Sequence, residues 1–409
     1  MKKIFKKIFL QKRFFLVLTG VILSFLVSYI FENFIFMAKI FFFLFLILIL
    51  VVAVLLFFSK GNIIADRIVP DKLSNGDENS IKIKVTNQYL FSCNVNIIDE
   101  LPFQFQKRDF SFLGILKSGE QKFYSYTIRP VERGVYSFGD LNIFASSPIG
   151  FLANKYTFSH NKEVPVYPSF LQLRKYDLLA FSNRLLEFGI KKIRRIGHTM
   201  EFEQIKDYIQ GDDIRNINWK ATAKRGQLMV NQFQDEKSQP IYSIIDKGRV
   251  MKMPFNALSL LDYAINATLV ISSIALKKND KAGMFSFSNK IENRVVAERR
   301  SSQMNLILET LYNLNTNFVE SDFSRLYIDT KRNLPQRSLL LLYTNFETLD
   351  ALHRQLPYLQ AIAKQHLLVV ILVVNELRKY GIQTILTKPE DLTINTINKY
   401  LEIKAKGLL

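Results

Sequence analysis

Residues 203–251 read EQIKDYIQGDDIRNINWKATAKRGQLMVNQFQDEKSQPIYSIIDKGRVM, and they join a β-rich region to a region of alternating strands and helices. Gly211-Asp212-Asp213 has turn chemistry, because glycine tolerates positive φ and aspartate bonds its own backbone. The alternating run at 228–233 predicts an extended segment. The apolar run at 241–246 predicts a buried strand ending in Asp246, and open α/β sheets place their sites at such strand ends.

The block from Gly211 to Lys224 resembles the hallmark of the domain-of-unknown-function 58 family. The residues that carry this resemblance, which we interpret as a partner-binding or domain-joining set, are Gly211, Asp212, Asp213, Arg215, Trp219, Lys220 and Lys224. Members of the family are membrane-anchored proteins with a von Willebrand factor A-like domain, commonly encoded beside MoxR-type AAA+ ATPases. The resemblance therefore implies this architecture and a MoxR-type ATPase as partner, whereas the family's biochemical activity is poorly defined.

Composition and charge bound the classes of protein that the chain can belong to. A length of 409 residues leaves room for two soluble domains and an anchor. The net charge of +19 permits affinity for anionic lipid, an acidic partner or nucleic acid. Cys93 is the single cysteine, which excludes an intramolecular disulfide and a multi-cysteine metal site, and its alternation with apolar residues predicts burial in a strand.

Two uncharged runs, at 14–31 and 40–59, are each long enough to cross a bilayer as a helix. The connection at 32–39 is too short for a domain, so residues 1–60 are predicted to form a transmembrane hairpin anchor. Basic residues before the first run predict a cytoplasmic amino terminus. Two crossings would return the chain to the cytoplasm, so we expect the soluble domains on the cytoplasmic face of a bacterial inner membrane.

Residues 61–168 change to a period of two, with turn signals at Asn75-Gly76, Ser118-Gly119 and Arg133-Gly134. Several short strands at this spacing predict a small antiparallel β-sandwich. The Arg133-Gly134-Val-Tyr136 hairpin also resembles the family, and we interpret Tyr136 and Phe138 as core or hairpin residues, with a ligand role as the less favoured alternative.

Residues 169–240 are predicted to hold the family signature and a linker. Trp219, the only tryptophan, is interpreted as a packing anchor between the soluble domains, with a partner contact as the alternative. His198 begins a cluster of acidic residues. This cluster either pairs with neighbouring arginines, which we favour, or contributes metal ligands.

Residues 241–409 alternate strand and helix patterns, which predicts a doubly wound parallel sheet. A helix is predicted at 256–276, with further strands at 280–287, 338–344 and 366–374 and helices at 303–314 and 348–365. The continuous apolar run at 338–344 is typical of a sheet covered on both faces. The resemblance narrows this prediction to the von Willebrand A-like form.

In von Willebrand A domains that bind a divalent cation, the ion is held by an Asp-x-Ser-x-Ser loop, a Thr from a second loop and a later Asp. When this motif is compared with the present sequence, Asp246 occupies the first position. Gly248 and Val250 occupy the positions of the two serines. Thr344-Asn345 stands where metal binders have Thr-Asp. These positions therefore form a degenerate metal site.

The middle threonine of that pattern has only Ser301 or Ser302 as candidates. Lys247 and Arg249 add positive charge beside the cation position. We therefore predict that no metal or other cofactor is bound, and that Asp246 is neutralised by Lys247, Arg249 or a backbone nest.

Three functions remain after this reading. The first, which we favour, is a membrane-tethered, non-enzymatic interaction protein that works with a MoxR-type ATPase in assembly or cell-envelope maintenance, since the chain has neither a P-loop nor a Gly-x-Ser-x-Gly elbow. The second is a hydrolase that uses His198 or His366 with nearby carboxylates. The third, nucleic-acid binding through basic clusters, ranks last because no stacking platform accompanies them. The sequence leaves the oligomeric state open.

Overall fold

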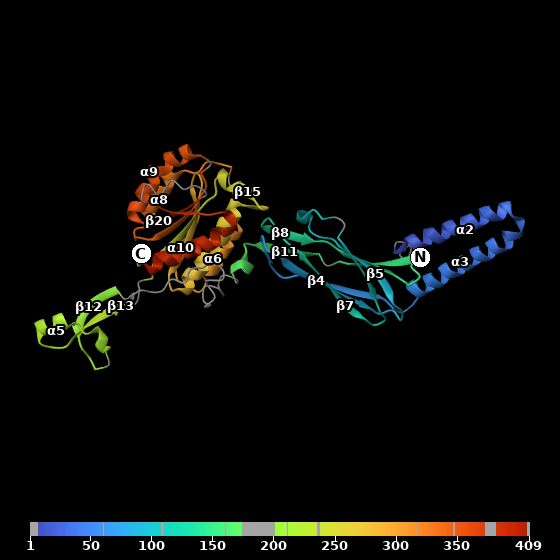
Figure 1. Cartoon of the computed structure of the whole chain (residues 1–409), viewed down its shortest axis with the longest axis horizontal. Coiled ribbons are helices and arrows are strands. Elements are labelled where there is room, and N and C mark those ends of the chain that lie inside the picture. The colour runs from blue at the N-terminus through green and yellow to red at the C-terminus, as the bar shows by residue number, and fades with distance from the viewer. Residues whose placement is uncertain are drawn as a thin grey trace. The chain divides into compact units, whose positions relative to one another are not determined.

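The computed structural model describes residues 7–59, 61–107, 110–159, 161–173, 201–210, 212–234, 238–316, 318–346, 348–372 and 382–406. The chain divides into two compact units, Met1–Tyr167 and Pro168–Leu409 (Figure 1). The first unit holds two apolar helices and antiparallel sheets, and the second is a mixed α/β unit.

The amino-terminal helices are α2 (Lys12–Ile30) and α3 (Ile35–Phe57), joined by the short helix η1 (Glu32–Phe34). Both are long and apolar enough to cross a membrane, as the sequence predicts. Most of their large apolar side chains are exposed in the structure, which suits contact with lipid. A third helix of this length and apolarity, α6 (Leu260–Lys277), is instead buried within the α/β unit.

The first unit contains one five-stranded and two three-stranded sheets. The five-stranded sheet has the order β1 (Ile8–Leu10), β10 (Leu152–Phe158), β9 (Leu141–Ser146), β5 (Cys93–Asp99) and β6 (Ser111–Leu116). The others are β2 (Ile63–Ile68), β4 (Asn79–Asn87), β7 (Gln121–Ile128), and β3 (Leu73–Ser74), β11 (Lys162–Tyr167), β8 (Gly134–Phe138). Cys93 and Tyr136 are buried in their common core, as predicted.

Two features of this unit depart from the sequence prediction. The β1 strand precedes the apolar helices and pairs antiparallel with β10, so the sheet includes residues from the segment predicted as anchor alone. The β3 strand pairs with β11 in parallel, so the sheets are not wholly antiparallel. Both pairings join segments that are distant in sequence, and local periodicity does not encode such partners.

A buried ion pair links strands of the first unit. Arg67 on β2 contacts Asp99 on β5, with Nη1 at 3.3 Å from Oδ1 and both side chains almost fully buried. The hydroxyl of Tyr126 also donates to Asp99, and Arg67 donates to the carbonyl of Gly139. Burial raises the pKa of Asp99, and the guanidinium of Arg67 opposes that rise.

The second unit is built on a six-stranded sheet. Its order is β18 (Ile291–Glu298), β17 (Lys281–Phe287), β14 (Pro240–Asp246), β19 (Leu339–Tyr343), β20 (Leu367–Leu372) and β21 (Gln383–Leu386). The pairings from β17 to β21 are parallel, whereas β18 is antiparallel to β17 at one edge. The predicted parallel sheet is therefore present with one antiparallel edge strand.

Helices cover both faces of this sheet (Figure 1). Alternate strand residues pack on α6, α7 (Gln303–Tyr312) and α10 (Leu392–Ala405) in one hydrophobic cluster. The intervening residues pack on α8 (Phe323–Asn333) and α9 (Leu349–Gln365) in the other. Because helices cover both faces of the sheet, the strand sequences are continuous runs of apolar residues.

The start of α6 differs from the predicted start at residue 256. A hairpin of β15 (Pro254–Phe255) and β16 (Leu258–Ser259) occupies this place, and Asn256 and Ala257 at its turn have φ of 47° and 69°. Ser259 then caps the helix in a reciprocal pair with Asp262. The cap therefore ends the turn, and the helix begins at Leu260, four residues later than predicted.

Candidate functional site

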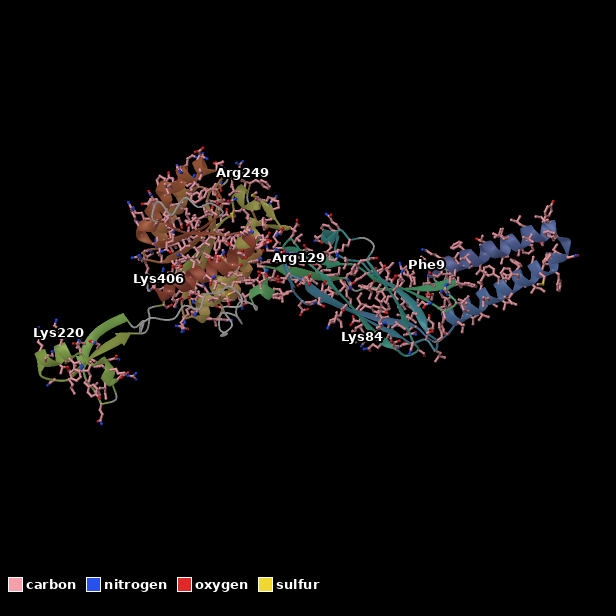
Figure 2. The ribbon with its side chains drawn as sticks, in the orientation of Figure 1. Phe9, Lys84, Arg129, Lys220, Arg249 and Lys406 are labelled. Carbon is pink, nitrogen blue, oxygen red and sulfur yellow. The ribbon has the colours of Figure 1, made fainter. Side chains whose placement is uncertain are left out.

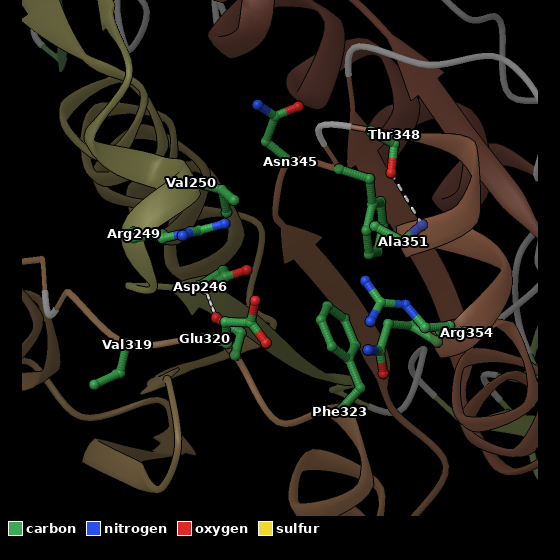
Figure 3. Close-up of a pocket in the computed structure, with 13 residues that line it drawn as sticks. Asp246, Arg249, Val250, Val319, Glu320, Phe323, Asn345, Thr348, Ala351 and Arg354 are labelled. Atoms are coloured by element: carbon green, nitrogen blue, oxygen red, sulfur yellow. Dashed lines mark hydrogen bonds between the residues drawn. The ribbon is translucent and has the colours of Figure 1, made fainter.

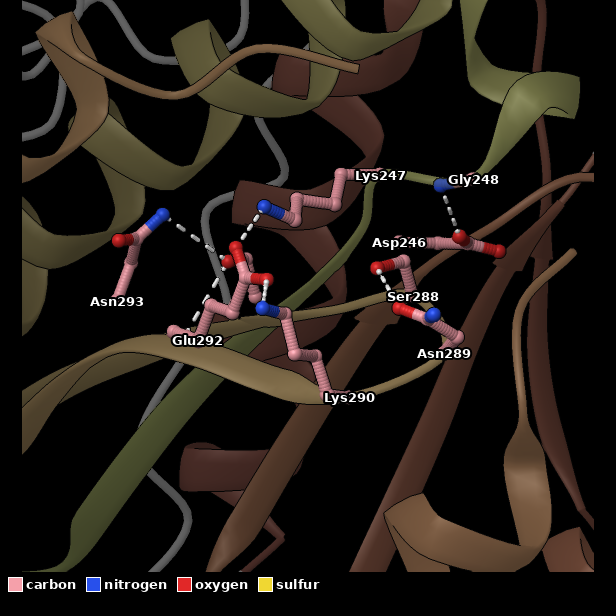
Figure 4. A network of polar contacts seen from close by, with 9 residues as sticks. Asp246, Lys247, Gly248, Ser288, Asn289, Lys290, Glu292 and Asn293 are labelled. Atoms are coloured by element: carbon pink, nitrogen blue, oxygen red, sulfur yellow. Dashed lines mark hydrogen bonds and ion pairs between the residues drawn. The ribbon is translucent and has the colours of Figure 1, made fainter. Parts of the chain in front are cut away.

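Asp246 lies at the carboxyl end of β14, and its carboxylate joins three loops (Figure 4). One oxygen, Oδ1, accepts hydrogen bonds from the backbone N–H of Gly248 at 2.8 Å and from the hydroxyl of Ser321. The other oxygen, Oδ2, accepts from Thr344 Oγ1 at 2.7 Å. Asp246 is only 1% exposed. Burial raises its pKa, while these three hydrogen bonds oppose the rise.

Lys247 takes no part in holding Asp246. Its ammonium pairs with Glu292 on β18, which also contacts Lys290 at 3.3 Å (Figure 4). The hydrogen bond from Lys247 lowers the pKa of Glu292. Of the alternatives predicted to neutralise Asp246, Lys247 pairs with Glu292 instead, whereas the backbone contributes one hydrogen bond to the carboxylate from the N–H of Gly248.

Gly248 is required by the close approach of the second loop. A Cβ at this position would lie 2.2 Å from the Oγ of Ser321 and 3.1 Å from the carbonyl oxygen of Val319. The second-loop hydroxyl beside Asp246 is thus Ser321, and the candidates Ser301 and Ser302 were wrong. The sequence signal for Ser321 was available, because Ser321-Asp322 directly precedes an amphipathic segment and Asp322 caps α8.

A cavity of about 150 Å³ opens beside Asp246 at this edge of the sheet (Figure 3). The predicted positions Val250 and Asn345 line it, as does Glu320. Arg249 and Arg354 lie on opposite sides of the cavity. The edge therefore combines a buried carboxylate with an exposed rim of mixed charge.

The donor set at this cavity can be compared with what a divalent cation requires. Magnesium prefers six oxygen ligands with carboxylates among them. Asp246 supplies one carboxylate, and the hydroxyls of Ser321 and Thr344 already donate to it. Within the described residues, no three His, Cys, Asp or Glu side chains are grouped to hold an ion. These residues do not fit such a cation, and the absence of a metal site stays our prediction.

The signature residues form a separate hairpin. The β12 strand (Glu201–Asp207) pairs with β13 (Met229–Gln234), and the connection holds η4 (Ile214–Asn216) and α5 (Trp219–Arg225). Asp212 accepts from the N–H of Ile209 and from Lys206, and both bonds lower its pKa. Gly211 lies outside the described residues, so the predicted turn is described only from Asp212 onward.

Capping residues fix the two short helices of this hairpin. Asp213 caps η4 by accepting from the N–H of Arg215 at 3.0 Å. Asn218 caps α5 by accepting from the N–H of Ala221 at 3.0 Å, and Gly226 ends the helix at a φ of 72°. The positions of Asp213, Asn218 and Gly226 thus determine where the two short helices of the hairpin begin and end, and they make this block compact.

The hairpin presents apolar and basic side chains to solvent. Trp219 is 68% exposed, and Ile209 and Ile214 are exposed to a similar degree. Lys220, labelled in Figure 2, and Lys224 belong to the same short helix as Trp219, α5. This exposure favours the partner-contact interpretation of the predicted set over the packing interpretation.

The two histidines of the hydrolase alternative do not assemble a site in the described residues. His198 lies outside them. His366 directly precedes β20 at the amino-terminal edge of the parallel strands, whereas Asp246 ends β14 at the carboxyl edge. Its two ring nitrogens are buried and have no hydrogen-bond partner among the described residues. No observation favours hydrolysis.

We expect His366 to make the α/β unit less stable in acid. Burial and nearby Arg337 lower its pKa below 6.5, so the unfolded chain takes up a proton that the folded chain resists. Stability is therefore retained above pH 6.5 and lost as the pH falls below it. The total loss is about 1.4 kcal/mol for each pH unit by which the pKa of the folded chain lies below that of the unfolded chain. Urea unfolding at several pH values measures this loss.

Replacing His366 with phenylalanine should remove this acid-dependent loss, because phenylalanine takes up no proton. His353→Gln is the matched control, since His353 lies exposed on α9. An acid-dependent loss that is unchanged in His366→Phe would contradict the assignment.

Fold and site together define a class of protein: a chain with two apolar amino-terminal helices, antiparallel sheets and an α/β unit that carries a buried acidic site and an exposed signature hairpin. Residues 204–393 match the family described as "Protein of unknown function DUF58". The match spans all but the first three residues of the signature hairpin and the whole of the six-stranded sheet.

The chain is also similar, over parts of its length, to other known proteins. The chain is 24% identical over 168 residues to "Uncharacterized protein YeaD" of Bacillus subtilis (strain 168), covering 41% of this chain and 39% of that protein. The chain thus spans well under half of that relative's length. Among solved structures, the CARDB domain of PF1109 from Pyrococcus furiosus gives a TM-score of 0.19 at 15% identity, covering 26% of this chain and 94% of that one. A PapD-like domain of human CEP192 gives 0.20 at 13% identity, covering 26% and 84%. These two scores are too low to define a shared fold.

Proposed function

We propose that the chain is a membrane-anchored protein-recognition module, and that its signature hairpin binds a partner protein. The observation that carries this proposal is the exposure of Trp219 on a capped helix, with Ile209 and Ile214 also exposed. Tryptophan and arginine are enriched among the residues that dominate binding energy at protein interfaces. A surface that exposes these large apolar side chains is more typical of a protein-binding site than of a face that contacts only water.

The free energy that burial of Trp219 in an interface would contribute to binding supports the proposal. A tryptophan side chain buries up to about 150–250 Å² in an interface. With most of Trp219 still exposed, covering it would contribute about 3 kcal/mol at the usual value per unit area. Lys220 and Lys224 lie on the same short helix as Trp219, and their positive charge favours an acidic partner surface, whereas Arg215 pairs with Asp213.

The family resemblance supports a MoxR-type AAA+ ATPase as the partner and a von Willebrand A-like form for the α/β unit. In this proposal the chain is not an enzyme and binds no nucleic acid, and ATP hydrolysis is supplied by the partner. The basic amino terminus supports a cytoplasmic location for the soluble domains at a bacterial inner membrane. Assembly or maintenance of the cell envelope is the process that this arrangement suits.

We expect Trp219→Ala to abolish recovery of the partner while leaving the fold intact. Trp219 is largely exposed, so its truncation should change the unfolding free energy by no more than about 0.5 kcal/mol. Co-purification of the tagged full chain from native membranes, followed by identification of the eluted proteins, measures partner recovery.

The matched control for this experiment is Phe103→Ala, which removes an aromatic side chain of the first unit that is even more exposed than Trp219. Partner recovery that survives Trp219→Ala would overturn the proposal. Unfolding of Trp219→Ala would do so as well, because it would show that Trp219 is a packing residue. Eluates of the unaltered chain that repeatedly lack an AAA+ ATPase would overturn the identity of the partner.

A further inference from the structure

A large open groove lies on the outer face of the five-stranded sheet, beside the start of α2. Its volume is about 750 Å³, and it is lined by β1, β9, β5, β6 and by Lys12 and Arg13. This groove belongs to the first unit and has no residue in common with the cavity at Asp246.

The strand register gives the groove a floor that is apolar at both edges and polar in the middle. Residues in register share a face of the sheet, and two adjacent rows consist of Phe9, Ala153, Ser146, Asn94, Ile115 and of Lys155, Phe144, Asn96, Leu113. At the β6 edge, Leu113 is 80% exposed and Ile115 is 63% exposed. At the β1 edge, Phe9 and Phe144 pack edge to face with ring centroids 4.9 Å apart. Exposed apolar side chains of this size indicate a binding surface.

Positive charge lines the mouth of the groove. Arg13 is fixed there by hydrogen bonds from Nη1 to the carbonyl oxygens of Pro148 and Ile149, at 3.1 and 3.3 Å. Lys155 lies over the ring of Phe144. Among the described residues, no carboxylate forms an ion pair with Lys12, Arg13 or Lys155. These charges are therefore available to an anion.

A buried polar atom lies in the floor between the apolar side chains. The Oδ1 of Asn96 has almost no contact with solvent and no hydrogen-bond partner in the described part of the chain. An acceptor left in this state is costly, so it favours a ligand that brings a donor such as a hydroxyl group.

The groove opens at the level of a bilayer surface if α2 crosses the membrane. Helix α2 begins at Lys12, and Phe9 precedes it by three residues, which span about 10 Å of extended chain. Interfacial protein segments insert their apolar faces about 5–10 Å into the headgroup boundary. Figure 2 shows Phe9 where the sheet meets the two helices. The groove is therefore continuous with the membrane-crossing surface.

We propose that this groove binds an anionic phospholipid of the bilayer, with the phosphate on Lys12 and Arg13 and the first acyl carbons on Phe9 and Phe144. Ile115 and Leu113 border the other side of the groove. A headgroup hydroxyl donates to Asn96. The inference rests on the membrane anchoring in the proposed function and is independent of the partner protein. The bound lipid covers the exposed edge of the sheet and fixes the first unit against the bilayer.

The test uses the full chain in nanodiscs of phosphatidylcholine, with increasing fractions of phosphatidylglycerol of the same acyl chains. The variant Ile115→Cys carries an environment-sensitive fluorophore in the groove. Burial raises the pKa of Cys93 to about 12, so the native thiol stays unreactive during labelling. We expect the emission to shift to the blue as phosphatidylglycerol is added. Lys12→Gln should weaken this response about fivefold, the usual effect of one basic residue near an anionic surface.

The matched control uses the other side of the same unit. Ile68 on β2 and Lys82 on β4 are register partners with exposed side chains, so Ile68→Cys carries the fluorophore and Lys82→Gln removes a charge. An equal response at Ile68, or an equal loss with Lys82→Gln, would show only the effect of net charge and would overturn the inference. A chain that enters nanodiscs without any response to phosphatidylglycerol also overturns it and leaves the anchor intact. A chain that fails to enter nanodiscs overturns the anchoring in the proposed function as well.

Discussion

Replacing Asp99 with alanine is expected to lower the unfolding free energy of the first unit by about 3–5 kcal/mol, because it leaves the guanidinium of Arg67 buried without its partner. The hydroxyl of Tyr126 loses its acceptor at the same time. Hydrogen exchange of the β2 and β5 backbone amides in the detergent-solubilised full chain measures this loss. No other pair in the first unit is buried to this extent among the described residues.

An exposed ion pair in the same unit gives the control. Lys162 and Asp71 are 3.0 Å apart, and the side chain of Asp71 is almost fully exposed. Asp71→Ala should change the stability by less than about 1 kcal/mol, since solvent screens such pairs. Combining Asp99→Ala with Arg67→Met removes the stranded charge and should recover part of the loss. Equal effects of Asp99→Ala and Asp71→Ala would refute the structural role given to the buried pair.

The second large effect is expected at Asp246. Asp246→Ala leaves the N–H of Gly248 and the hydroxyls of Ser321 and Thr344 without their acceptor. Each buried donor without a partner costs about 1–3 kcal/mol, so we expect a loss of at least about 3 kcal/mol in the stability of the α/β unit. Hydrogen exchange of the β14 and β19 amides follows the change.

Two further variants define the cause of that loss. Adding Ser321→Ala and Thr344→Val to Asp246→Ala removes two of the stranded donors and should recover part of the stability. Glu320→Ala changes an exposed carboxylate at the rim of the same cavity and should shift stability by no more than about 0.5 kcal/mol. If the added substitutions lower stability further, Asp246 does not act as the acceptor that joins the three loops.

Much of the α/β unit could be predicted from sequence, because its strands are short apolar runs between helical patterns. The run at 241–246 became β14 with Asp246 at its end, and the runs at 338–344 and 366–374 became β19 and β20. The signal is strong because both faces of the sheet are covered, so each strand position must be apolar. The local sequence pattern is therefore sufficient to predict these three strands.

The parts that sequence missed depend on partners distant in the chain. The side chain beside Asp246 is Ser321, which belongs to the loop between α7 and α8. Backbone hydrogen bonds from Arg249 to Val319 and from Asp322 to Ser288 hold this loop in place. The three-residue strand β1 becomes a strand only because β10 pairs with it. Neither fact can be derived from periodicity, since both follow from tertiary contacts that form after the local elements exist.

The pairing of β1 with β10 has a consequence for biosynthesis. Residues Ile8–Leu10 leave the ribosome before helices α2 and α3, yet their partner Leu152–Phe158 is made after nearly all of the remaining strands of the unit. The β1 strand must therefore wait unpaired until β10 is made. If α2 and α3 enter a bilayer, the pairing requires an even number of crossings between β1 and β10, whichever compartment the sheets occupy.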